Sequence, residues 1–435
     1  MQVRLAELII SRSKLNKMEL KKYKLGECLE LQRGYDLTSS QMHDGKVAVV
    51  GSNGIIGHHN SERGYSPCIT VGRSGSVGKA HYYEQPTWVH NTALFVKDFK
   101  GNNPKYLYYL LKNLHLDKIF EKGSSVIPSL DRKLVHSLVV PFHKDINDQR
   151  KIVDVLSVID GKIELNRQIN DNLEAMAKHL YDYWFVQFDF PNEEGKPYKS
   201  SGGAMVWNEK LKREIPQGWK VLSVNDIATN VRGVSYTKDD LVSSDRGILV
   251  LRGNNIQDNR LIYDSNVVYI PKSFVSEDQH IHPLDIIMTM SSGSKEHIGK
   301  CAMFQLASED TFGAFLTKFT AKEHCAFMLF NLFNSQYFKA KIKSIASGTG
   351  INNLTNQTFD EIYVTIPQDN QLFEFDKKQA QIFAEIGLIE KNNLELTKQR
   401  DELLPLLMNG QASVNYHLLN CTCCSSTCLL IPPTR

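Results

Sequence analysis

Two stretches of the chain carry apolar or asparagine side chains at seven-residue intervals. Within each stretch, a second row of such side chains lies between the members of the first row. Between residues 149 and 185 the two rows are Ile152, Ile159, Asn166, Leu173, Leu180 and Leu156, Ile163, Asn170, Ala177, Trp184. Near the end of the chain they are Phe375, Ile382, Ile389, Leu396, Leu403 and Ile386, Asn393, Leu407. This spacing is typical of a coiled-coil seam. It predicts two long helices, each the obvious partner of the other.

We expect the seam between these helices to consist of thirteen positions. They are Ile152, Leu156, Ile159, Ile163, Asn170, Leu173, Leu180, Ile382, Ile386, Ile389, Asn393, Leu396 and Leu403. A helix of about 35 residues is about 50 Å long, which is enough to hold two globular units apart. The alternative is an ordinary core helix that shows heptads by chance, although helices of this length are uncommon in compact domains.

The segments in front of the two helices share a series of landmarks in the same order. The landmarks of the first copy are Tyr23-Lys24-Leu25, Arg33-Gly34 and Ser76-Val77-Gly78-Lys79. Those of the second copy are Trp219-Lys220-Val221, Arg232-Gly233 and His297-Ile298-Gly299-Lys300. Each series ends in a Gly/Ser-rich loop and a short apolar run that leads to Pro141 or Pro367. The ordered set indicates a duplicated unit.

Short apolar runs and turn residues alternate within each copy. Strands are predicted near Val47–Val50, Ala93–Val96, Leu138–Val140, Ile248–Leu251, Asn266–Ile270 and Asp285–Met290, and helices over Pro104–Phe120 and Glu323–Lys343. Each copy is therefore expected to be a mixed α and β domain.

The predicted organisation has seven segments. The first half has an N-terminal extension over residues 1–19, a first domain over 20–145, a helix over 146–188 and a flexible linker over 189–215. The second half has a second domain over 216–370, a helix over 371–410 and a disordered tail over 411–435. The tail holds four of the eight cysteines, Cys421, Cys423, Cys424 and Cys428, which are too close together for a zinc site of paired CxxC motifs.

Charge is distributed unevenly over a chain whose formal net charge is +3. Residues 1–145 hold 21 Lys/Arg against 13 Asp/Glu, and residues 216–370 hold 14 against 16. The first domain has the positive balance that attracts nucleic acid, whereas the second would need locally clustered cations. No apolar stretch reaches membrane-spanning length, and we expect a soluble, cytoplasmic protein.

Catalytic and cofactor motifs are missing. The stretch from Gly72 to Lys79 resembles a phosphate loop, but Arg73 and Ala80 occupy positions where such a loop needs Gly and Ser/Thr. No methyl-donor loop, adenine-presenting tetrapeptide, nuclease carboxylate set or metal-ligand spacing occurs in the sequence. We therefore expect a recognition protein with no catalytic residues, no metal and no cofactor of its own.

These motifs resemble those of the specificity subunit of prokaryotic type I restriction-modification enzymes. The resemblance extends over about residues 20 to 411 and rests on Arg73–Lys79, Gly123–Leu130, Gln149–Ile152, Ile163–Asn170 and Arg400–Leu407. It implies an α+β fold in which two similar mixed α/β target-recognition domains are separated by two long antiparallel coiled-coil helices with pseudo-two-fold symmetry.

The resemblance also implies a function and a set of partners. Each domain would read one half of a bipartite, interrupted site in double-stranded DNA, and the helices would dock two modification subunits. S-adenosylmethionine, ATP and Mg would be bound by the modification and restriction (endonuclease) subunits. The alternative is a duplicated scaffold that binds protein partners through its coiled coil.

Loop residues that recur at corresponding landmarks are the candidate DNA contacts, because small, polar and cationic side chains suit phosphates and base edges. They are Arg33, Arg73, Ser74, Lys79 and Ser125 in the first domain and Arg232, Lys295, Lys300 and Asn352 in the second. A tight hairpin with merely solvent-exposed cations is the alternative for each of them.

Overall fold

The chain forms two compact units that share two long helices. The computed structural model describes residues 10–11, 19–120, 129–263, 267–305, 308–346 and 353–414. The first unit comprises Met1–Leu165 and Asn393–Arg435, and the second comprises Asn166–Asn392. Helix α6 (Ile146–Tyr181, 36 residues) begins in the first unit and ends in the second. Helix α10 (Asp369–Met408, 40 residues) begins in the second and ends in the first, so both long helices predicted from the heptads exist.

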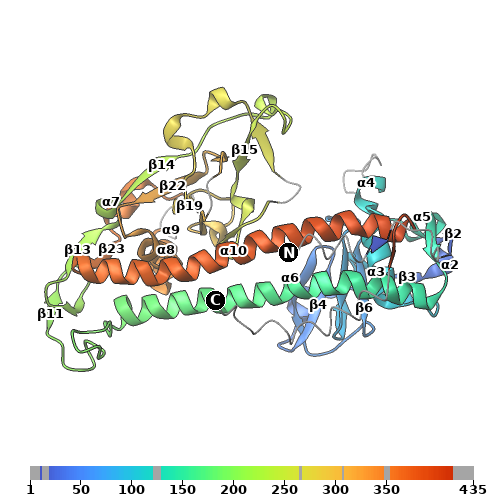
Figure 1. Ribbon diagram of the computed structural model, residues 1–435, viewed down its shortest axis with the longest axis horizontal. Helices are drawn as coiled ribbons and strands as arrows, with labels where there is room; N and C mark the ends of the chain where they lie inside the picture. Colours follow the sequence, from blue (N-terminus) through green and yellow to red (C-terminus); the bar gives the residue numbers. More distant parts are fainter. Residues whose placement is uncertain are drawn as a thin grey trace, which may run out of the picture. The chain divides into compact units, whose positions relative to one another are not determined.

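The first unit, which includes the elements labelled β2, β3, β4 and β6 in Figure 1, contains a four-stranded sheet, a three-stranded sheet and two strand pairs. The four-stranded sheet has the order β3 (Glu30–Arg33), β9 (Ala93–Asp98), β6 (Cys68–Gly72), β7 (Ala80–Tyr83). The three-stranded sheet has the order β5 (Gly54–His59), β4 (Val47–Gly51), β8 (Thr87–Val89), and β4 and β8 are parallel. Strand β2 (Leu20–Lys24) pairs with β10 (Val139–His143). The helices are α2 (Leu25–Cys28), α3 (Pro104–Asn113), α4 (Leu116–Phe120) and α5 (Arg132–Ser137).

The second unit repeats this topology and adds a short hairpin, β16 (Ile256–Gln257) and β17 (Arg260–Leu261), after β15. Its four-stranded sheet has the order β14 (Ala228–Arg232), β22 (Leu316–Ala321), β19 (Ile286–Thr289), β20 (Cys301–Met303). Its three-stranded sheet has the order β18 (Val268–Ile270), β15 (Ile248–Leu251), β21 (Thr311–Phe312), with β15 and β21 parallel. Strand β13 (Lys220–Ser223) pairs with β23 (Tyr363–Ile366), and the helices are α7 (Val224–Ile227), α8 (Ala326–Asn334) and α9 (Gln336–Ala346). The duplication inferred from the landmarks is therefore confirmed at the level of topology.

Backbone hydrogen bonds define which residues of the two copies correspond. The amide of Leu25 donates to the carbonyl of Leu138 over 2.8 Å, and that of Val224 donates to Ile362 over 3.0 Å at the same point of the fold. Tyr23 therefore corresponds to Leu222, which lies three residues after Trp219. The predicted correspondence of Tyr23 with Trp219 is wrong. Both residues are aromatic, but Tyr23 lies within β2 whereas Trp219 precedes β13.

In the first unit, the ends of the two long helices complete the domain core. Ile152 and Leu156 of α6 and Leu403 and Leu407 of α10 are buried in one cluster with the sheet and α3. Further seam positions in this unit are buried (Ile163) or half-buried (Ile159, Asn393, Leu396). Arg400 of α10 pairs with Asp160 of α6 over 3.1 Å, and Asp160 also accepts a 2.6 Å hydrogen bond from Tyr109 of α3.

In the second unit, the other ends of the same helices pack with opposite chain directions. The side-chain amide of buried Gln379 on α10 donates a hydrogen bond to the backbone carbonyl of Ala177 on α6 over 2.8 Å. Phe375 lies about one turn before Gln379, and Phe185 lies about two turns after Ala177. The rings of Phe375 and Phe185 meet edge to face with centroids 4.8 Å apart. The remaining seam positions are buried (Asn170, Ile382, Ile386) or half-buried (Leu173, Leu180, Ile389).

Helix α10 buries a second face that the heptads did not reveal. Phe383 stacks on Phe327 of α8 with ring centroids 5.0 Å apart, and it also meets Phe330 at 5.7 Å. The second unit's α8 therefore packs directly on α10. A residue outside the a/d rows is buried because α8 supplies a separate partner surface.

The predicted flexible linker over 189–215 is folded. It contains the hairpin β11 (Met205–Asn208) and β12 (Arg213–Pro216). Phe190 stacks between Tyr198 and Trp219, with centroid distances of 4.7 and 4.9 Å. Contacts among Phe190, Tyr198 and Trp219 hold this segment against the domain, which its polar composition did not indicate.

Other element boundaries also differ from the sequence-based expectation. The predicted helix over 104–120 breaks at His115, whose φ is 46°, and that over 323–343 breaks at Ser335. At the chain ends, Ile10–Ser11 pairs with Ser413–Val414 and Ala412 is buried, so the predicted extension and tail are not wholly outside the fold. The four tail cysteines lie outside the described residues. Within the described part of the chain, no helix is long and apolar enough to cross a membrane.

The packing of α10 against α6 predicts the effect of one core truncation. Phe375→Ala removes a fully buried ring that meets Phe185 and Trp184, and it should lower the free energy of unfolding by about 3–5 kcal/mol. Phe373→Ala, at a ring that is 47% exposed on the same helix, is the matched control and should cost under about 1 kcal/mol. Chemical denaturation monitored by circular dichroism measures both; equal effects would contradict the packing described here.

Candidate nucleic-acid interface

The loop between β6 and β7 is closed by its own backbone. The amide of Gly72 donates to Lys79 over 2.9 Å, and that of Gly78 donates back to Gly72 over 2.8 Å. Gly78 has φ 83°, and a Cβ on Gly72 would lie 1.9 Å from the carbonyl oxygen of Ser76. Both glycines are therefore required by the turn. The loop holds Arg73 and Ser74 near one end and exposes Lys79 at the other.

The loop between β19 and β20 is closed by the same two bonds. The amide of Thr289 donates to Lys300 over 2.8 Å, and that of Gly299 donates to Thr289 over 2.9 Å. Gly299 has φ 77°. Lys79 and Lys300 are thus structurally equivalent, as the landmarks predicted. Lys295 opens a short 3₁₀ helix within this loop, and its side chain is outside what the structure describes.

Arg33 and Arg232 are equivalent residues at the ends of β3 and β14. The next residue in each copy, Gly34 or Gly233, donates its amide to Ala93 or Leu316 over 2.9 and 3.1 Å. A Cβ on Gly34 would lie 2.2 Å from the carbonyl oxygen of His90, so a glycine is needed for this close approach. A Cβ on Gly233 would meet backbone oxygens at 2.3 Å in the same way.

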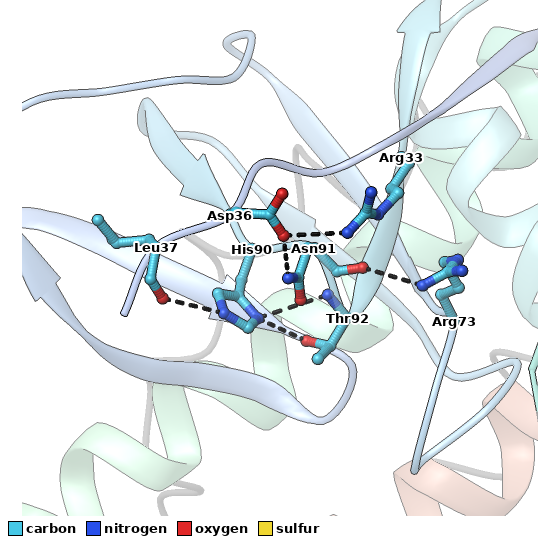
Figure 2. Close-up of polar contacts among 7 residues, drawn as sticks. All are labelled: Arg33, Asp36, Leu37, Arg73, His90, Asn91 and Thr92. Carbon is cyan, nitrogen blue, oxygen red and sulfur yellow. Dashed lines mark hydrogen bonds and ion pairs between the residues drawn. The ribbon is translucent and has the colours of Figure 1, made fainter. Parts of the chain in front are cut away.

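Asp36 connects Arg33 to the loop that contains Asn91. Figure 2 shows its carboxylate between Arg33, at 3.0 Å, and the side-chain amide of Asn91, which donates to it. Arg73 donates to the backbone carbonyl of Asn91 over 3.4 Å. The Asn91 hydrogen bond, with a smaller contribution from Arg33, lowers the pKa of Asp36. The carboxylate is therefore charged near neutral pH and holds Arg33 and the Asn91 loop together.

His90 fixes the other side of this loop. Its ring contacts the Thr92 hydroxyl at 2.9 Å and the Leu37 carbonyl at 3.2 Å (Figure 2). In the second unit, Arg232 donates instead to the carbonyl of Ala314 over 3.0 Å. The loop beside each arginine is thus held by hydrogen bonds, which favours preorganised contacts.

A cavity of about 360 Å³ in the first unit is lined by three arginines. Arg33 and Arg73 were predicted from the landmarks, but Arg132 was missed. It is the first residue of α5, whose N-cap Asp131 accepts a 2.8 Å hydrogen bond from the Lys133 amide. Leu94, Ser129, Leu130 and Asp131 line the rest of the cavity. Arg132 gave no sequence signal, because nothing in the sequence places it beside Arg33.

A larger cavity, of about 700 Å³, lies beside the corresponding loop of the second unit. Lys300 and His297 line it, together with the ring of Phe315, which is 66% exposed. Thr289 is buried in its wall, and its hydroxyl has no hydrogen-bond partner in the described part of the chain. A polar cavity with an exposed ring and a lysine suits a polar, partly aromatic ligand. Sequence reasoning missed Phe315 and His297.

The remaining predicted contact residues lie in these loops or outside the described residues. Ser74 forms an isolated β-bridge with Ser129, and the equivalent Ser291 forms one with Asn353. Lys79 donates to the Asn53 side chain in the β4–β5 turn over 3.2 Å. Burial, and secondarily Lys79, lowers the pKa of His81. Ser125 and Asn352 lie outside the described residues. Across the ranges given above, no three His, Cys, Asp or Glu side chains are grouped to hold a metal.

Comparison with known families identifies the fold that carries these loops. A family profile described as "Type I restriction modification DNA specificity domain" matches residues 17–175 and 216–405, one match for each copy of the topology. The chain belongs to this family.

Relatives within the family share parts of the sequence. The StySPI type I restriction enzyme specificity subunit of Salmonella potsdam is 32% identical over 203 residues, covering 45% of this chain and 41% of that protein. The chain thus spans about two fifths of that relative's length. The MjaIX specificity subunit of Methanocaldococcus jannaschii is 26% identical over 326 residues, covering 71% of this chain and 69% of that protein.

One solved structure supports the fold. The crystal structure of a type I restriction-modification S subunit from M. genitalium superposes with a TM-score of 0.50 and covers 91% of this chain and 98% of that one. Its sequence identity is 16%, so the likeness concerns the fold alone.

The close approach at Gly34 predicts a strong local effect of one added methyl group. Gly34→Ala forces the backbone at His90 to move and should destabilise the chain by more than about 1 kcal/mol. Gly161→Ala, in α6 with nothing within 4 Å of the new Cβ, is the control and should stabilise by up to about 1 kcal/mol. Thermal unfolding compares them. A neutral Gly34→Ala variant would show that the two backbones are not in contact.

Proposed function

We propose that this chain is the DNA-specificity subunit of a type I restriction-modification complex. Each recognition domain reads one half of a bipartite, interrupted site in double-stranded DNA. The observation that carries the proposal is the double family match on two copies of one topology, each of which presents a cation-bearing loop at the same position. Two different copies of a reader on one chain favour an asymmetric, two-part site.

The charge distribution supports DNA as the ligand. The first domain has the positive balance noted above, and three of its arginines line one cavity. Phosphate attraction of this kind is long-ranged and sensitive to salt. The second domain lacks a net positive charge, but its loop places Lys300 beside a cavity of polar side chains. A local cation can therefore meet a phosphate without an overall basic surface.

The helices supply the docking surface for two modification subunits in this proposal. Exposed apolar residues recur along α6 at intervals of seven, four and seven positions: Val158, Leu165, Ile169 and Met176. Their exposed fractions are 49, 56, 38 and 51%. They lie outside the thirteen seam positions and repeat with helical periodicity. A stripe of this kind marks a helix face that a partner covers.

The chain is proposed to be non-catalytic. S-adenosylmethionine is assigned to the modification subunits, and ATP and Mg to the restriction subunits. This assignment follows from the absence of cofactor-binding motifs in the sequence and from the multisubunit complexes that the family resemblance implies. The alternative, a duplicated scaffold that binds only proteins, predicts no salt-dependent affinity for DNA.

The central test reconstitutes the chain with modification subunits from its source cell. The chain alone, given S-adenosylmethionine and DNA, should transfer no methyl group, and the complex should methylate an asymmetric two-part sequence that long-read sequencing identifies. Its DNA affinity should fall by about one decade or more between 50 and 200 mM salt. Methyl transfer by the isolated chain would refute the non-catalytic assignment, and a complex without salt-dependent DNA binding would favour the scaffold.

The exposed stripe of α6 gives a separate prediction about assembly. Leu165→Asp should abolish co-purification of modification subunits while the unfolding midpoint of the chain stays within a few degrees, because this side chain is 56% exposed. Leu241→Asp, at a site that is 40% exposed and outside the long helices, should leave assembly intact. Normal assembly of Leu165→Asp would show that this face is not the docking surface.

A further inference from the structure

The two domains provide an internal comparison in which scaffold positions correspond and side chains differ. Both would meet the same sugar-phosphate backbone, whereas the bases of an asymmetric site differ between its halves. Phosphate contacts carry no sequence information, and base contacts carry all the direct readout. Cations kept at equivalent positions therefore suit phosphates. A cation that faces the cavity in one copy and has no counterpart in the other suits a base.

Two cations are kept in both copies. Arg33 and Arg232 end equivalent strands and pair with Leu94 and Thr317 at matching register positions. Lys79 and Lys300 close equivalent loops. The ion pair of Arg33 with Asp36 is half-exposed or more at both side chains, 52% and 73%, so exchange of Asp36 for a phosphate costs little.

Arg73 is not kept. The backbone carbonyl of Arg73 accepts a hydrogen bond from the Leu130 amide over 2.8 Å. In the second copy, the carbonyl of Met290 accepts one from the Leu354 amide, also over 2.8 Å. Arg73 and Met290 also donate their own amides to Thr92 and Phe315, over 2.8 and 2.9 Å. Met290 is therefore the equivalent of Arg73. It is only 6% exposed and belongs to the core, so the second domain has no guanidinium at this point.

Arg132 is not kept either. It follows Asp131, the N-cap of α5, two residues after Leu130. At the equivalent place Thr355 is the N-cap of a 3₁₀ helix, and Asn356 follows it. The cavity of the first domain thus combines one kept arginine with two that the second domain replaces by methionine and asparagine.

We propose that Arg73 and Arg132 read guanine edges in the half-site bound by the first domain, while Arg33, Arg232, Lys79 and Lys300 bind backbone phosphates in both halves. This inference rests on the proposed function and assigns roles within it. Guanine presents two acceptors, N7 and O6, in the major groove, and the planar guanidinium fork matches both. A lysine cannot reproduce that bidentate geometry.

The test uses the full chain assembled with its modification subunits and compares Arg73→Ala, Arg73→Lys and Arg132→Ala. Methylated sequences are mapped by long-read sequencing, and affinities are measured for duplexes carrying each base substitution. Each variant should lose roughly ten-fold or more of the preference for guanine at one position of one half-site, and the other half-site should be read unchanged. Arg73→Lys should relax the same position as Arg73→Ala, which separates readout from loss of charge.

Matched variants test the phosphate assignment. Lys79→Ala and Lys300→Ala should weaken binding to all sequences alike and reduce the salt slope by about one. Lys133→Ala changes an exposed cation next to Arg132 that does not line the cavity, and it should leave the modified sequence unchanged.

Two results would overturn the inference. One is uniform weakening of all sequences by the arginine variants with base preference intact, and the other is an unaltered modified sequence in Arg73→Ala and Arg132→Ala. In either case the wild-type complex still recognises a two-part site. A wild-type complex without such a site instead removes the proposed function, so the two failures are distinguishable. If Arg73→Ala misfolds, Arg73→Lys and Arg132→Ala still decide the outcome.

Discussion

Each recognition domain depends on helix segments that come from distant parts of the sequence. In the first unit, Leu403 and Leu407 near the end of the last long helix are buried against a core that begins at Leu25. The His143 ring contacts the Leu407 carbonyl at 3.1 Å, and both groups are buried. Removing the last helix would therefore expose apolar surface in the first domain, because hydrophobic burial is the main driving force that holds such elements together.

The second unit has the same dependence with the helices exchanged. Its core contains Ala177 and Phe185 from the end of α6 and the region that follows it, together with Phe375 and Ile386 of α10. The buried Gln379 side chain would be costly without its bond to the Ala177 carbonyl, since a buried amide needs a partner. Ion pairs also connect this domain to α6. Arg260 of the second domain contacts Glu174 and Asp171 on α6 at 2.7 and 2.8 Å.

Under the proposed function, duplication allows one scaffold to carry two different DNA-reading surfaces. The glycines of the equivalent loops are kept because backbone atoms approach them closely, as at Gly34 and Gly233. Side chains that only face the cavities are under no such constraint. Arg73 and Met290 occupy the same place with the same backbone bonds, although one lines a cavity and the other is buried in a core. Fold and specificity can therefore vary independently in this architecture.

The sequence by itself determined the long helices, the duplication and the position of the paired lysines. Seven-residue periodicity reports one buried helix face directly, and Gly-Lys at Gly78 and Gly299 marks loops whose backbone conformation few other residues adopt. Only the tertiary structure placed Arg132 beside Arg33, because the two arginines come from distant segments. It also decided the folded state of residues 189–215, where Phe190, Tyr198 and Trp219 stack despite a polar composition. Local patterns record the environment of single elements, whereas contacts between elements depend on how the whole domain packs.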